Sequence, residues 1–505
     1  MVTTVAVLDI GKTNKKLCCY RRSADGPLAL VETVTASFPA VEGDHGLQYE
    51  DTRSLWEWLA VELPALYRRH PFAALAITTH GATYALIDAQ GGLAYPVIAY
   101  DSPISDEQQR HLDQGFYHLV GPLAKVQAET GSCDLPLLVN PAKSLYTLRE
   151  RHPQALSAAT SLLNYPQYWG FRLTGQRAAE ATYTANHSFL FDIQQRTASS
   201  IAQALGVAHL LPKSLQRPWD QLGVLAPELQ EAWSLPAIPV AVGIHDSNAA
   251  LLPHLLGHGD QDFVLNSTGT WCVAMHRVST PEYQEHELEQ KIIFNIDCFG
   301  DIHKTSFLMA GQDYGLYHDL IGGVDPGYDP QRVARSIAHV GNAIMPGAFP
   351  SQFPGWHGGA NEDDGTTRRH WSVEELRAGQ GPTWWSDQDQ AHDLLNVSLA
   401  LQSQVALQRT GISEHTTICI EGGFSNNGTY VAMLAECFPQ ATVALTNIEE
   451  ATSCGTALLA LALAEGKDLK DYRDTVPIIM DPVSAPRFDG SAAYIEAYHR
   501  RLAEL

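Results

Sequence analysis

The sequence predicts an α/β protein built from two halves, and three observations support this. Short apolar runs typical of buried strands alternate with longer segments whose apolar residues have helical spacing. A pattern of strand, small polar turn and strand occurs near the start of the chain and again after residue 260. Between these two places, Pro236 and Pro239 indicate a boundary. We therefore expect one domain over residues 1–239 and a second over residues 240–505.

The net charge of the chain and the length of its apolar runs argue against nucleic-acid and membrane partners. The chain has 505 residues, of which 33 are Lys or Arg and 56 are Asp or Glu, so its formal net charge is −23. An acidic surface repels phosphate backbones and anionic lipids, and we therefore expect no nucleic-acid or membrane partner. No apolar run approaches the roughly 18 residues that a membrane span requires. With 45% hydrophobic residues, the chain can bury large cores.

Cysteine usage and the first residues bear on localisation. The eight cysteines contain no C-x-x-C pair, and six of them are scattered singly. This spacing is typical of reduced thiols rather than of a disulfide framework or a zinc site. The chain enters an apolar segment at residue 2 without the basic region of a secretory signal. We therefore expect a cytoplasmic protein.

The first half is expected to open with a β-hairpin. Residues 5–9 and 17–20 are typical of strands, and the turn between them carries Gly11, Thr13 and Asn14. The remaining elements expected before residue 240 are a helix over 55–66 with Thr52 as its N-cap, a strand over 75–79 that leads to His80, a hairpin of 85–88 and 93–98 that ends at Asp101, and a helix-rich region over 105–235.

The second half repeats the alternation of strands and helices. A strand over 240–243 leads to His245, Asp246 and a helical run of small residues, and a hairpin of 263–266 and 271–275 encloses a polar turn. The polar, turn-rich composition of residues 355–390 indicates surface loops or an insertion. The last elements expected are helices over 388–410, 430–437 and 451–464 and strands over 416–420 and 442–445.

The turn after the first strand is a candidate phosphate site, although it is not a P-loop. The P-loop pattern would require glycine at position 6, where this chain has Ala6. Backbone N–H groups around Gly11 and the hydroxyl of Thr13 can still converge on a phosphate. Asp9 at the strand end could hold the water shell of Mg²⁺. The alternative is an ordinary hairpin in which Asp9 accepts hydrogen bonds from the turn.

The polar turn after residue 266 offers the same chemistry a second time. Ser267, Thr268, Gly269 and Thr270 place hydroxyl groups and a glycine between two apolar strands. Such turns are common singly. Two of them at the heads of two α/β halves favour a pair that grips one polyphosphate from both sides.

Asp246 stands where a strand meets a helix. Ligands of open α/β folds bind at this edge of the sheet, so the carboxylate could accept the proton of a substrate hydroxyl as a general base. The alternative is a helix N-cap, a position that aspartate favours.

Gly422 and Gly423 join another strand to a helix. Paired glycines let a flat ligand lie against the backbone, and the helix N-terminus attracts negative charge. The sequence here has no G-x-G-x-x-G fingerprint, so a Rossmann dinucleotide site is not supported, and a tight turn is the alternative. His80 follows a buried strand and could face a polyol, whereas most lone histidines are structural.

Taken in order, these segments resemble the FGGY carbohydrate kinases of the actin-like ATPase superfamily. The matching segments are Leu8-Asp9-Ile10-Gly11, Thr79-His80-Gly81, Leu173-Thr174-Gly175, Gly243-Ile244-His245-Asp246, Ser267-Thr268-Gly269-Thr270-Trp271, Glu421-Gly422-Gly423-Phe424-Ser425-Asn426 and Glu450-Ala451-Thr452-Ser453-Cys454-Gly455. The resemblance implies two ribonuclease-H-like domains with an interdomain cleft, and ATP held mainly by the second domain. It also implies Mg²⁺-dependent transfer of the γ-phosphoryl group to a sugar hydroxyl, and a homodimer.

The resemblance also implies a role for each matching residue. Asp246 corresponds to the catalytic base, and Asp9 lies beside the metal. The phosphate turns contain Gly11, Thr13 and Asn14 in the first half and Thr268, Gly269 and Thr270 in the second, the adenosine segment contains Gly422, Gly423 and Asn426, and the sugar pocket contains His80, His245 and Asp101.

Two departures from the family pattern lie near these residues. Lys12 stands where the family often has threonine, and a contact of Lys12 with phosphate is one interpretation. The common W-x-D-x-R sugar segment corresponds to residues 99–103, in which Trp and Arg are both missing around Asp101. The His245-Asp246 pair and the Thr-Gly-Thr-Trp segment resemble the rhamnulose and fuculose kinases more than the glycerol or xylulose kinases.

The sequence therefore predicts an ATP-dependent kinase for a ketose, either a 6-deoxyketohexose or a ketopentose, or for a related polyol. Two alternatives stay open. One is a catalytically silent sugar-binding protein with this fold, and the other is an actin-like ATPase that does not act on sugars.

Overall fold

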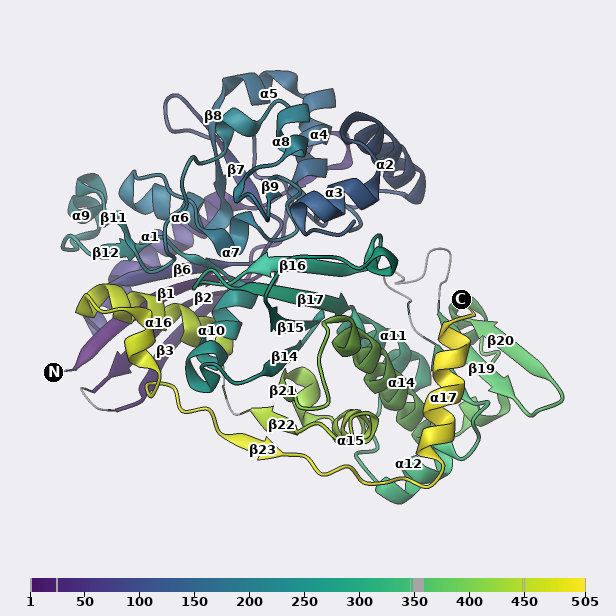
Figure 1. Ribbon diagram of the computed structural model, residues 1–505. Helices are drawn as coiled ribbons and strands as arrows, with labels where there is room; N and C mark the ends of the chain where they lie inside the picture. The colour runs from purple at the N-terminus through teal and green to yellow at the C-terminus, as the bar shows by residue number, and fades with distance from the viewer. Residues whose placement is uncertain are drawn as a thin grey trace. The chain divides into compact units, whose positions relative to one another are not determined.

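The chain folds into two compact units that interleave along the sequence. The computed structural model describes residues 2–23, 26–345, 347, 358–446, 448 and 450–504. Figure 1 shows the elements of both units, coloured along the chain. Unit 1 comprises Met1–Gly259, Val278–His303 and Glu449–Ile478, and unit 2 comprises Asp260–Arg277, Lys304–Ile448 and Ile479–Leu505.

Unit 1 contains a mixed sheet of seven strands. In spatial order these are β11 (Gln221–Val224), β12 (Pro239–Ala241), β6 (Leu75–Thr79), β1 (Thr3–Ile10), β2 (Lys15–Arg22) and β3 (Leu28–Ala36), and β13 (Ile244–His245) also pairs with β6. β1 and β2 form the predicted hairpin and are antiparallel. β6 runs parallel to β1, and β13 runs parallel to β6, so these three strands end at the same edge of the sheet.

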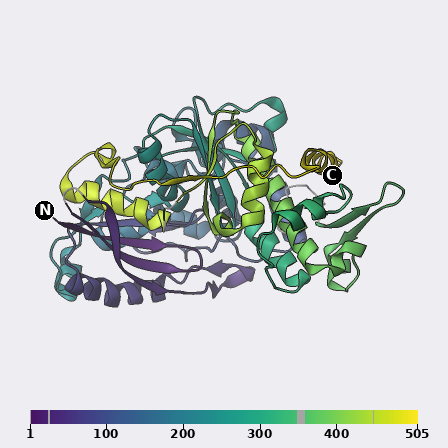
Figure 2. The ribbon, with the colours of Figure 1, turned by 90° about the horizontal axis from the view of Figure 1, so that it is seen from below.

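Helices cover both faces of this sheet. Successive side chains of a strand point to opposite faces, and Leu8 of β1 packs in one core with Leu59. On the other face, the Tyr20 hydroxyl of β2 lies 2.7 Å from Ser453 Oγ. Figure 2 shows the purple strands between the yellow helix α16 and the purple helix α1. The covering helices are α1 (Thr52–Arg69) and α6 (Tyr165–Thr174) on the first face and α10 (Asp246–His258) and α16 (Ala451–Glu465) on the second.

The predicted helix over residues 55–66 is confirmed as part of α1, but its N-cap is not Thr52. Asp51 Oδ1 accepts a hydrogen bond from Ser54 N–H at 2.9 Å, one residue before the predicted cap. The region 105–235 is helix-rich, as predicted. The further elements of unit 1 are β4 (Val41–Glu42), β5 (Gln48–Tyr49), α2 (Asp106–Val120), α3 (Leu123–Thr130), α4 (Pro141–Arg151), α5 (Pro153–Ala158), α7 (Ala181–Thr184), β9 (Phe191–Asp192), β10 (Thr197–Ala198), α8 (Ser200–Ala204), α9 (Pro227–Trp233) and β16 (Ile292–Ile296).

The predicted hairpin of residues 85–88 and 93–98 is wrong in its second strand. β7 (Tyr84–Asp88) pairs antiparallel with β8 (Ala159–Asn164), which follows about seventy residues later. Residues 93–98 meet β7 through an isolated bridge between Ile87 and Leu93. Pro96 has no N–H group to donate, which disfavours a continuous ladder in this segment.

Residues 240–259 belong to unit 1, although the predicted boundary lies at residue 239. β12 and β13 complete the first sheet by pairing with β6, and α10 packs against α16. As a result, Asp246 lies in the same compact unit as Asp9 and His80.

Unit 2 is built on a second mixed sheet. The strands that lie wholly or mostly in unit 2 are, in spatial order, β17 (Ile302–Leu308), β15 (Cys272–Val278), β14 (Phe263–Thr268), β21 (Thr417–Gly422), β22 (Val443–Thr446) and β23 (Met480–Pro482). β14 and β15 form the predicted hairpin, and β21 runs parallel to β14. The longer helices of this unit are α11 (Ala310–Ile321), α12 (Pro330–Ile337), α14 (Gln388–Arg409), α15 (Gly428–Cys437) and α17 (Ser491–Leu502). Across the described ranges, no helix combines the length and apolar character needed to cross a membrane.

The polar segment 355–390 contains regular structure where it is described. β18 (Ala343–Met345), β19 (Gly359–Asp363) and β20 (Arg368–Ser372) form a three-stranded antiparallel sheet, and α13 (Val373–Arg377) follows. The surface-loop alternative is therefore wrong for residues 359–363 and 368–377, and the alternative of an insertion stays a prediction. Residues 355–357 of this segment lie outside the described residues.

Candidate active site

The predicted site residues of unit 1 gather where three parallel strands end. Asp9 is the penultimate residue of β1, His80 follows β6 directly, and Asp246 follows β13 as the first residue of α10. The register places Ile10 beside Thr79 and Thr79 beside His245. Open α/β sheets place their ligands at this carboxyl edge. Sequence reasoning placed each of these residues at a strand end, and the pairing of β1, β6 and β13 makes the ends adjacent.

Asp246 is a carboxylate that stays ionised. Its Oδ1 lies 2.9 Å from His245 Nδ1 and accepts a hydrogen bond from Ser247 N–H at 2.7 Å. Burial raises the pKa of Asp246, but the neighbouring His245 and the Ser247 amide outweigh it, so the net shift is downward. The side chain is 32% exposed. An ionised, accessible carboxylate at this position can accept a proton from a bound hydroxyl.

His245 is held between Asp246 and residues of the α7 segment. Its backbone N–H donates to Thr182 Oγ1 at 3.1 Å, and its Nε2 lies 3.0 Å from Asn186 Nδ2. Its Nδ1 accepts a hydrogen bond from Ser247 N–H at 3.2 Å, which makes His245 the N-cap of α10. His245 therefore positions the candidate base.

Asp9 is buried and faces a second acid. Burial, and then the negative charge of Asp246, raise the pKa of Asp9 to about 7, although Lys16 lowers it. Lys16 is itself paired with Glu450, whose Oε2 is 2.5 Å from the ammonium group. A divalent cation beside Asp9 would relieve the repulsion between the two carboxylates. Carboxylates are also the protein ligands that Mg²⁺ prefers, so the residues present fit the expected metal.

The first polar turn is tight, and its tip is exposed. A Cβ at Gly11 would lie 2.9 Å from the Asn14 carbonyl oxygen, so a larger residue would displace the turn. Lys15, which is buried, donates from Nζ to the Lys12 carbonyl oxygen at 2.7 Å and braces the turn from inside. Thr13 and Asn14 are exposed at the tip, as a phosphate-binding turn requires.

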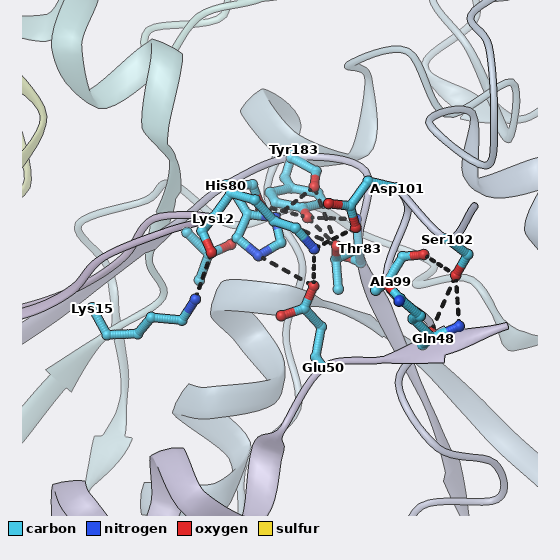
Figure 3. Close-up of polar contacts among 12 residues, drawn as sticks. Lys12, Lys15, Gln48, Glu50, His80, Thr83, Ala99, Asp101, Ser102 and Tyr183 are labelled. Atoms are coloured by element: carbon cyan, nitrogen blue, oxygen red, sulfur yellow. Dashed lines mark hydrogen bonds and ion pairs between the residues drawn. The ribbon is translucent and has the colours of Figure 1, made fainter. Parts of the chain in front are cut away.

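The ammonium group of Lys12 contacts two acidic residues, Glu50 and Asp101, that lie away from the exposed tip of the turn. Its Nζ lies 2.7 Å from Glu50 Oε1 and 2.6 Å from Asp101 Oδ1, and it stands 4.8 Å from the centre of the Tyr100 ring. Figure 3 shows Lys12 and His80 converging on Glu50. The interpretation of Lys12 as a phosphate ligand gains no support from these contacts. Asp101 is brought into the site by Lys12, in the absence of the family's Trp and Arg.

Glu50 is a site residue that sequence reasoning missed. It is buried and follows the short strand β5 directly, and His80 Nε2 lies 3.9 Å from its Oε1. An isolated acid next to the helix cap Asp51 gives no periodic signal of its own. The one available signal was that a lysine in a hairpin turn needs an acidic partner elsewhere in the chain.

Several buried polar atoms in this region have no hydrogen-bond partner within the described structure. They are His80 Nε2, Asn186 Oδ1 and His187 Nδ1. Burial lowers the pKa of His80 and, together with His245, lowers that of His187 to about 3, so both rings are neutral at physiological pH. Buried polar groups are nearly always paired, and such a group of unpaired atoms fits a ligand with several hydroxyl groups. Asn186 and His187 were not predicted from the sequence.

In unit 2, the predicted phosphate turn and adenosine segment lie side by side. β14 and β21 are parallel neighbours, with Thr268 beside Gly422. Thr268 Oγ1 donates to the Glu421 carbonyl oxygen at 2.5 Å and accepts a hydrogen bond from Phe424 N–H at 3.0 Å. The Thr268 hydroxyl therefore ties the two turns together. The exposed part of the phosphate turn is Gly269 and Thr270.

Gly422 has no room for a side chain. Its φ is +84°, and a Cβ there would collide with the Thr268 carbonyl oxygen. At Gly423 the nearest atom to a Cβ is the same oxygen at 3.9 Å. Gly422, Gly423 and Asn426 are exposed, which leaves bare backbone against which a flat ligand can lie.

Two models of known protein domains match the chain, one over its first half and one over its second. Residues 4–253 match the model of the N-terminal domain of the FGGY family of carbohydrate kinases, and residues 260–468 match the FGGY carbohydrate kinase C-terminal domain. The chain belongs to the FGGY family of carbohydrate kinases. This confirms the family that the motifs predict.

Similar proteins include kinases named for several sugars. L-Fuculokinase of Escherichia coli K12 is 30% identical over 282 residues, which cover 54% of this chain and 56% of that protein. Rhamnulokinase of Enterococcus faecalis is 26% identical over 292 residues, which cover 56% of each chain. The matched segment thus spans a little over half the length of these curated relatives.

Solved structures of FGGY kinases confirm the predicted two-domain α/β fold of the actin-like ATPase superfamily. A carbohydrate kinase from Novosphingobium aromaticivorans matches with a TM-score of 0.77 and 25% identity, covering 99% of this chain and 98% of that one. Xylulose kinase from Lactobacillus acidophilus matches with a TM-score of 0.79 and 15% identity, covering 99% of this chain and 97% of that one.

Proposed function

We propose that the chain is an ATP-dependent kinase that transfers the γ-phosphoryl group of ATP to a hydroxyl group of a ketose or related polyol. The observation that carries this proposal is the state of Asp246. It is an ionised carboxylate at the strand edge, partly exposed, and it sits beside a histidine that is linked to buried polar atoms in need of partners. This combination suits proton removal from a polyhydroxylated acceptor.

Asp246 serves as the general base in this proposal. His245 and the Ser247 amide occupy Oδ1, and the acceptor proton is taken up at Oδ2. His245 fixes the orientation of the carboxylate, and His80 keeps a neutral ring directed at the acceptor. Phosphoryl transfer depends mainly on positioning and charge, so these roles account for most of what unit 1 must contribute.

Asp9 is the proposed ligand of Mg²⁺, and the glycine-rich turns are the proposed nucleotide contacts. When bound, MgATP would supply the phosphoryl group, and the cation held by Asp9 would offset negative charge on the phosphates. Support for the turns comes from their exposed residues, Thr13 and Asn14 in the first turn and Gly269 and Thr270 in the second. The phosphate contacts proposed are Gly11, Thr13, Asn14, Gly269, Thr270 and, through its backbone, Thr268, and the adenosine contacts are Gly422, Gly423 and Asn426.

The acceptor is proposed to be a 6-deoxyketohexose or a ketopentose. The relatives with the stronger matches are named fuculokinase and rhamnulokinase, and a xylulose kinase of Escherichia coli is 25% identical over 291 residues. His80, His245 and Asp101 are the proposed sugar contacts, and we add Glu50, Asn186 and His187 to this proposal because they lie next to them. A homodimer is part of the same proposal and is tested by light scattering of the purified protein.

A coupled ADP-release assay across pentuloses, 6-deoxyhexuloses, tetruloses and polyols tests the proposal. We expect slow ADP release with MgATP alone and a large increase with one ketose or a closely related group of sugars. Fast, sugar-independent hydrolysis would favour an actin-like ATPase. Sugar binding by calorimetry without a phosphorylated product would favour a silent binding protein.

A further inference from the structure

We propose that unit 1 carries a second cation site, formed by Asp44, His45 and His152, which binds a borderline divalent metal such as Zn²⁺ or Co²⁺. One ligand atom from each residue lies within 4.8 Å of the other two. These residues lie outside the set assigned to nucleotide, Mg²⁺ or acceptor above. The inference is independent of the kinase proposal.

The spacing of the ligand atoms suits a tetrahedral metal. Asp44 Oδ2 lies 3.2 Å from His152 Nε2. A tetrahedron with metal–ligand bonds of roughly 2.0–2.1 Å has edges of roughly 3.3–3.4 Å. The pair is therefore already close to the separation that a shared metal imposes. His45 is exposed, so its ring can rotate to bring one nitrogen to a similar distance from both of these atoms.

The carboxylate of Asp44 is oriented by two tyrosines. Tyr95 donates to Asp44 Oδ1 at 2.8 Å, and Tyr49 donates to the same oxygen. These bonds engage Oδ1 and leave Oδ2 turned toward His152. Hydroxyl groups that fix the ligating carboxylate in this way are typical of the outer shell of a metal site.

His152 has a fixed position and a ring nitrogen without a hydrogen bond. It forms the junction between α4 and α5, and its side chain is 12% exposed. Its Nε2 is buried and has no hydrogen-bond partner within the described structure, although the Asp44 carboxylate is nearby. The ring centre lies 4.8 Å from that of Tyr95, which limits its rotation. A metal ion would use this nitrogen directly.

The donor set selects the class of metal. Two imidazole nitrogens and one carboxylate oxygen suit Zn²⁺, Co²⁺ or Ni²⁺, whereas Mg²⁺ prefers oxygen ligands and retained waters. The Mg²⁺ expected at Asp9 is therefore a poor competitor here. The alternative without a metal is a simple Asp44–His152 ion pair next to an unengaged His45.

A metal at this place would restrain the segment that supplies Glu50. Asp44 and His45 lie between β4 and β5, and Gln48 of β5 donates from its backbone N–H to Ser102 Oγ at 2.9 Å. Glu50 follows two residues later and pairs with Lys12. The site would fasten this hairpin to the α4–α5 junction, and so stabilise the acceptor side from a distance.

Cobalt absorption of the full chain tests the site directly. Metal-stripped protein is titrated with Co²⁺, and we expect saturable visible absorption bands of a low-symmetry, four- or five-coordinate ion, which Zn²⁺ removes and Mg²⁺ does not. Zn²⁺ should also raise the melting temperature. His45→Asn is chosen because asparagine tolerates the positive φ of +53° at this position. His152→Gln and Asp44→Asn remove the other two ligands.

Each of the three variants should weaken Co²⁺ binding by at least about tenfold, the usual effect of losing a protein ligand or its outer-shell support. His118→Ala, an exposed histidine of α2, is the matched control and should bind Co²⁺ as the parent does. Absence of absorption in the parent, or absorption that persists in both His45→Asn and His152→Gln, would overturn the proposal. Neither readout depends on sugar phosphorylation.

Discussion

The ends of the two central sheets occupy equivalent positions but carry different chemistry. In unit 1, β1, β6 and β13 lead to three titratable residues, the buried Asp9 and His80 and the partly exposed Asp246. In unit 2, β14 and β21 lead to glycine, threonine and asparagine, with much of the backbone exposed. The first edge is therefore characterised by titratable side chains, and the second by backbone that is accessible to a ligand.

This difference matches what the two halves of a phosphoryl transfer require. Removal of a proton from an acceptor needs a group whose ionisation is controlled by its neighbours, as His245 and the Ser247 amide lower the pKa of Asp246. Binding a nucleotide needs N–H groups and flat surface close to the ligand, which side chains would obstruct. Substitutions at the first edge should therefore alter turnover and pH dependence, and those at the second should alter nucleotide affinity and folding.

The largest expected effect is that of Asp246→Asn on turnover. We expect kcat to fall by on the order of 10²–10⁴, because the amide cannot take up the acceptor proton. Nucleotide affinity and melting temperature should change little, since the amide oxygen still accepts from Ser247 N–H. ADP release measures the first quantity and calorimetry with ADP the second. Asp106→Asn on the exposed surface of α2 is the control. Turnover close to the parent value would remove Asp246 from the mechanism.

Gly422→Ala should have the largest effect at the second edge. The new Cβ collides with the Thr268 carbonyl oxygen and requires a positive φ of +84°, so we expect a loss of about 2–4 kcal/mol in the free energy of unfolding. ADP binding should be lost with it. Gly423→Ala is a matched control, because its Cβ has 3.9 Å to the same oxygen. Denaturant unfolding that gives equal stability for the two variants would contradict this account.

Asp9→Asn removes a negative charge from the first edge while keeping a side chain of nearly the same shape. The folded protein raises the pKa of Asp9 from 3.8 to about 7, so between these values it binds a proton that the unfolded chain does not. Stability contributed by this carboxyl therefore falls as pH rises through that window. In Mg²⁺-free buffer at about pH 8 we expect the variant to be more stable by about 1–3 kcal/mol, and this advantage should shrink toward pH 5.

Thermal unfolding with and without Mg²⁺ measures this effect. Added Mg²⁺ should stabilise the parent more at about pH 8 than at about pH 6, because the metal competes with the proton on Asp9. The variant should lose this metal response and its kinase activity together. A variant that is less stable than the parent at about pH 8 without metal would show that burial and Asp246 do not strain the Asp9 carboxylate.

Local patterns were sufficient to predict the elements that carry the chemistry. The hairpin that presents Asp9, the strand before His80 and the strand–helix junction at Asp246 each have a signal within ten or so residues. What these patterns could not show is which distant strand pairs with which. β7 pairs with β8 instead of residues 93–98, and residues 240–245 join the first sheet, because these choices depend on burial across the whole unit.

The site residues that were not predicted from the sequence were missed for one physical reason. Glu50, Asn186 and His187 lie in loops or at the ends of short elements, where periodicity gives no information, and they matter through what they face in space. Thr268 illustrates the opposite case. Its position in the phosphate turn was predicted, yet its hydroxyl is used to join two backbone segments, which can be seen only when β14 and β21 are paired.

The smallest predicted effect is that of Lys12→Met, which tests whether the Lys12 ammonium acts near the sugar or near the phosphates. Lys12→Met removes the cation that Glu50 and Asp101 share while keeping a long side chain against Tyr100. The pair is partly exposed, so we expect a cost of about 1 kcal/mol, seen as a rise in the KM for the sugar of about fivefold at unchanged kcat. The KM for ATP should not move. Lys125→Met on the exposed surface of α3 is the control. A rise in the KM for ATP instead would place the Lys12 ammonium on the phosphates, beside the contacts proposed for Gly11, Thr13 and Asn14.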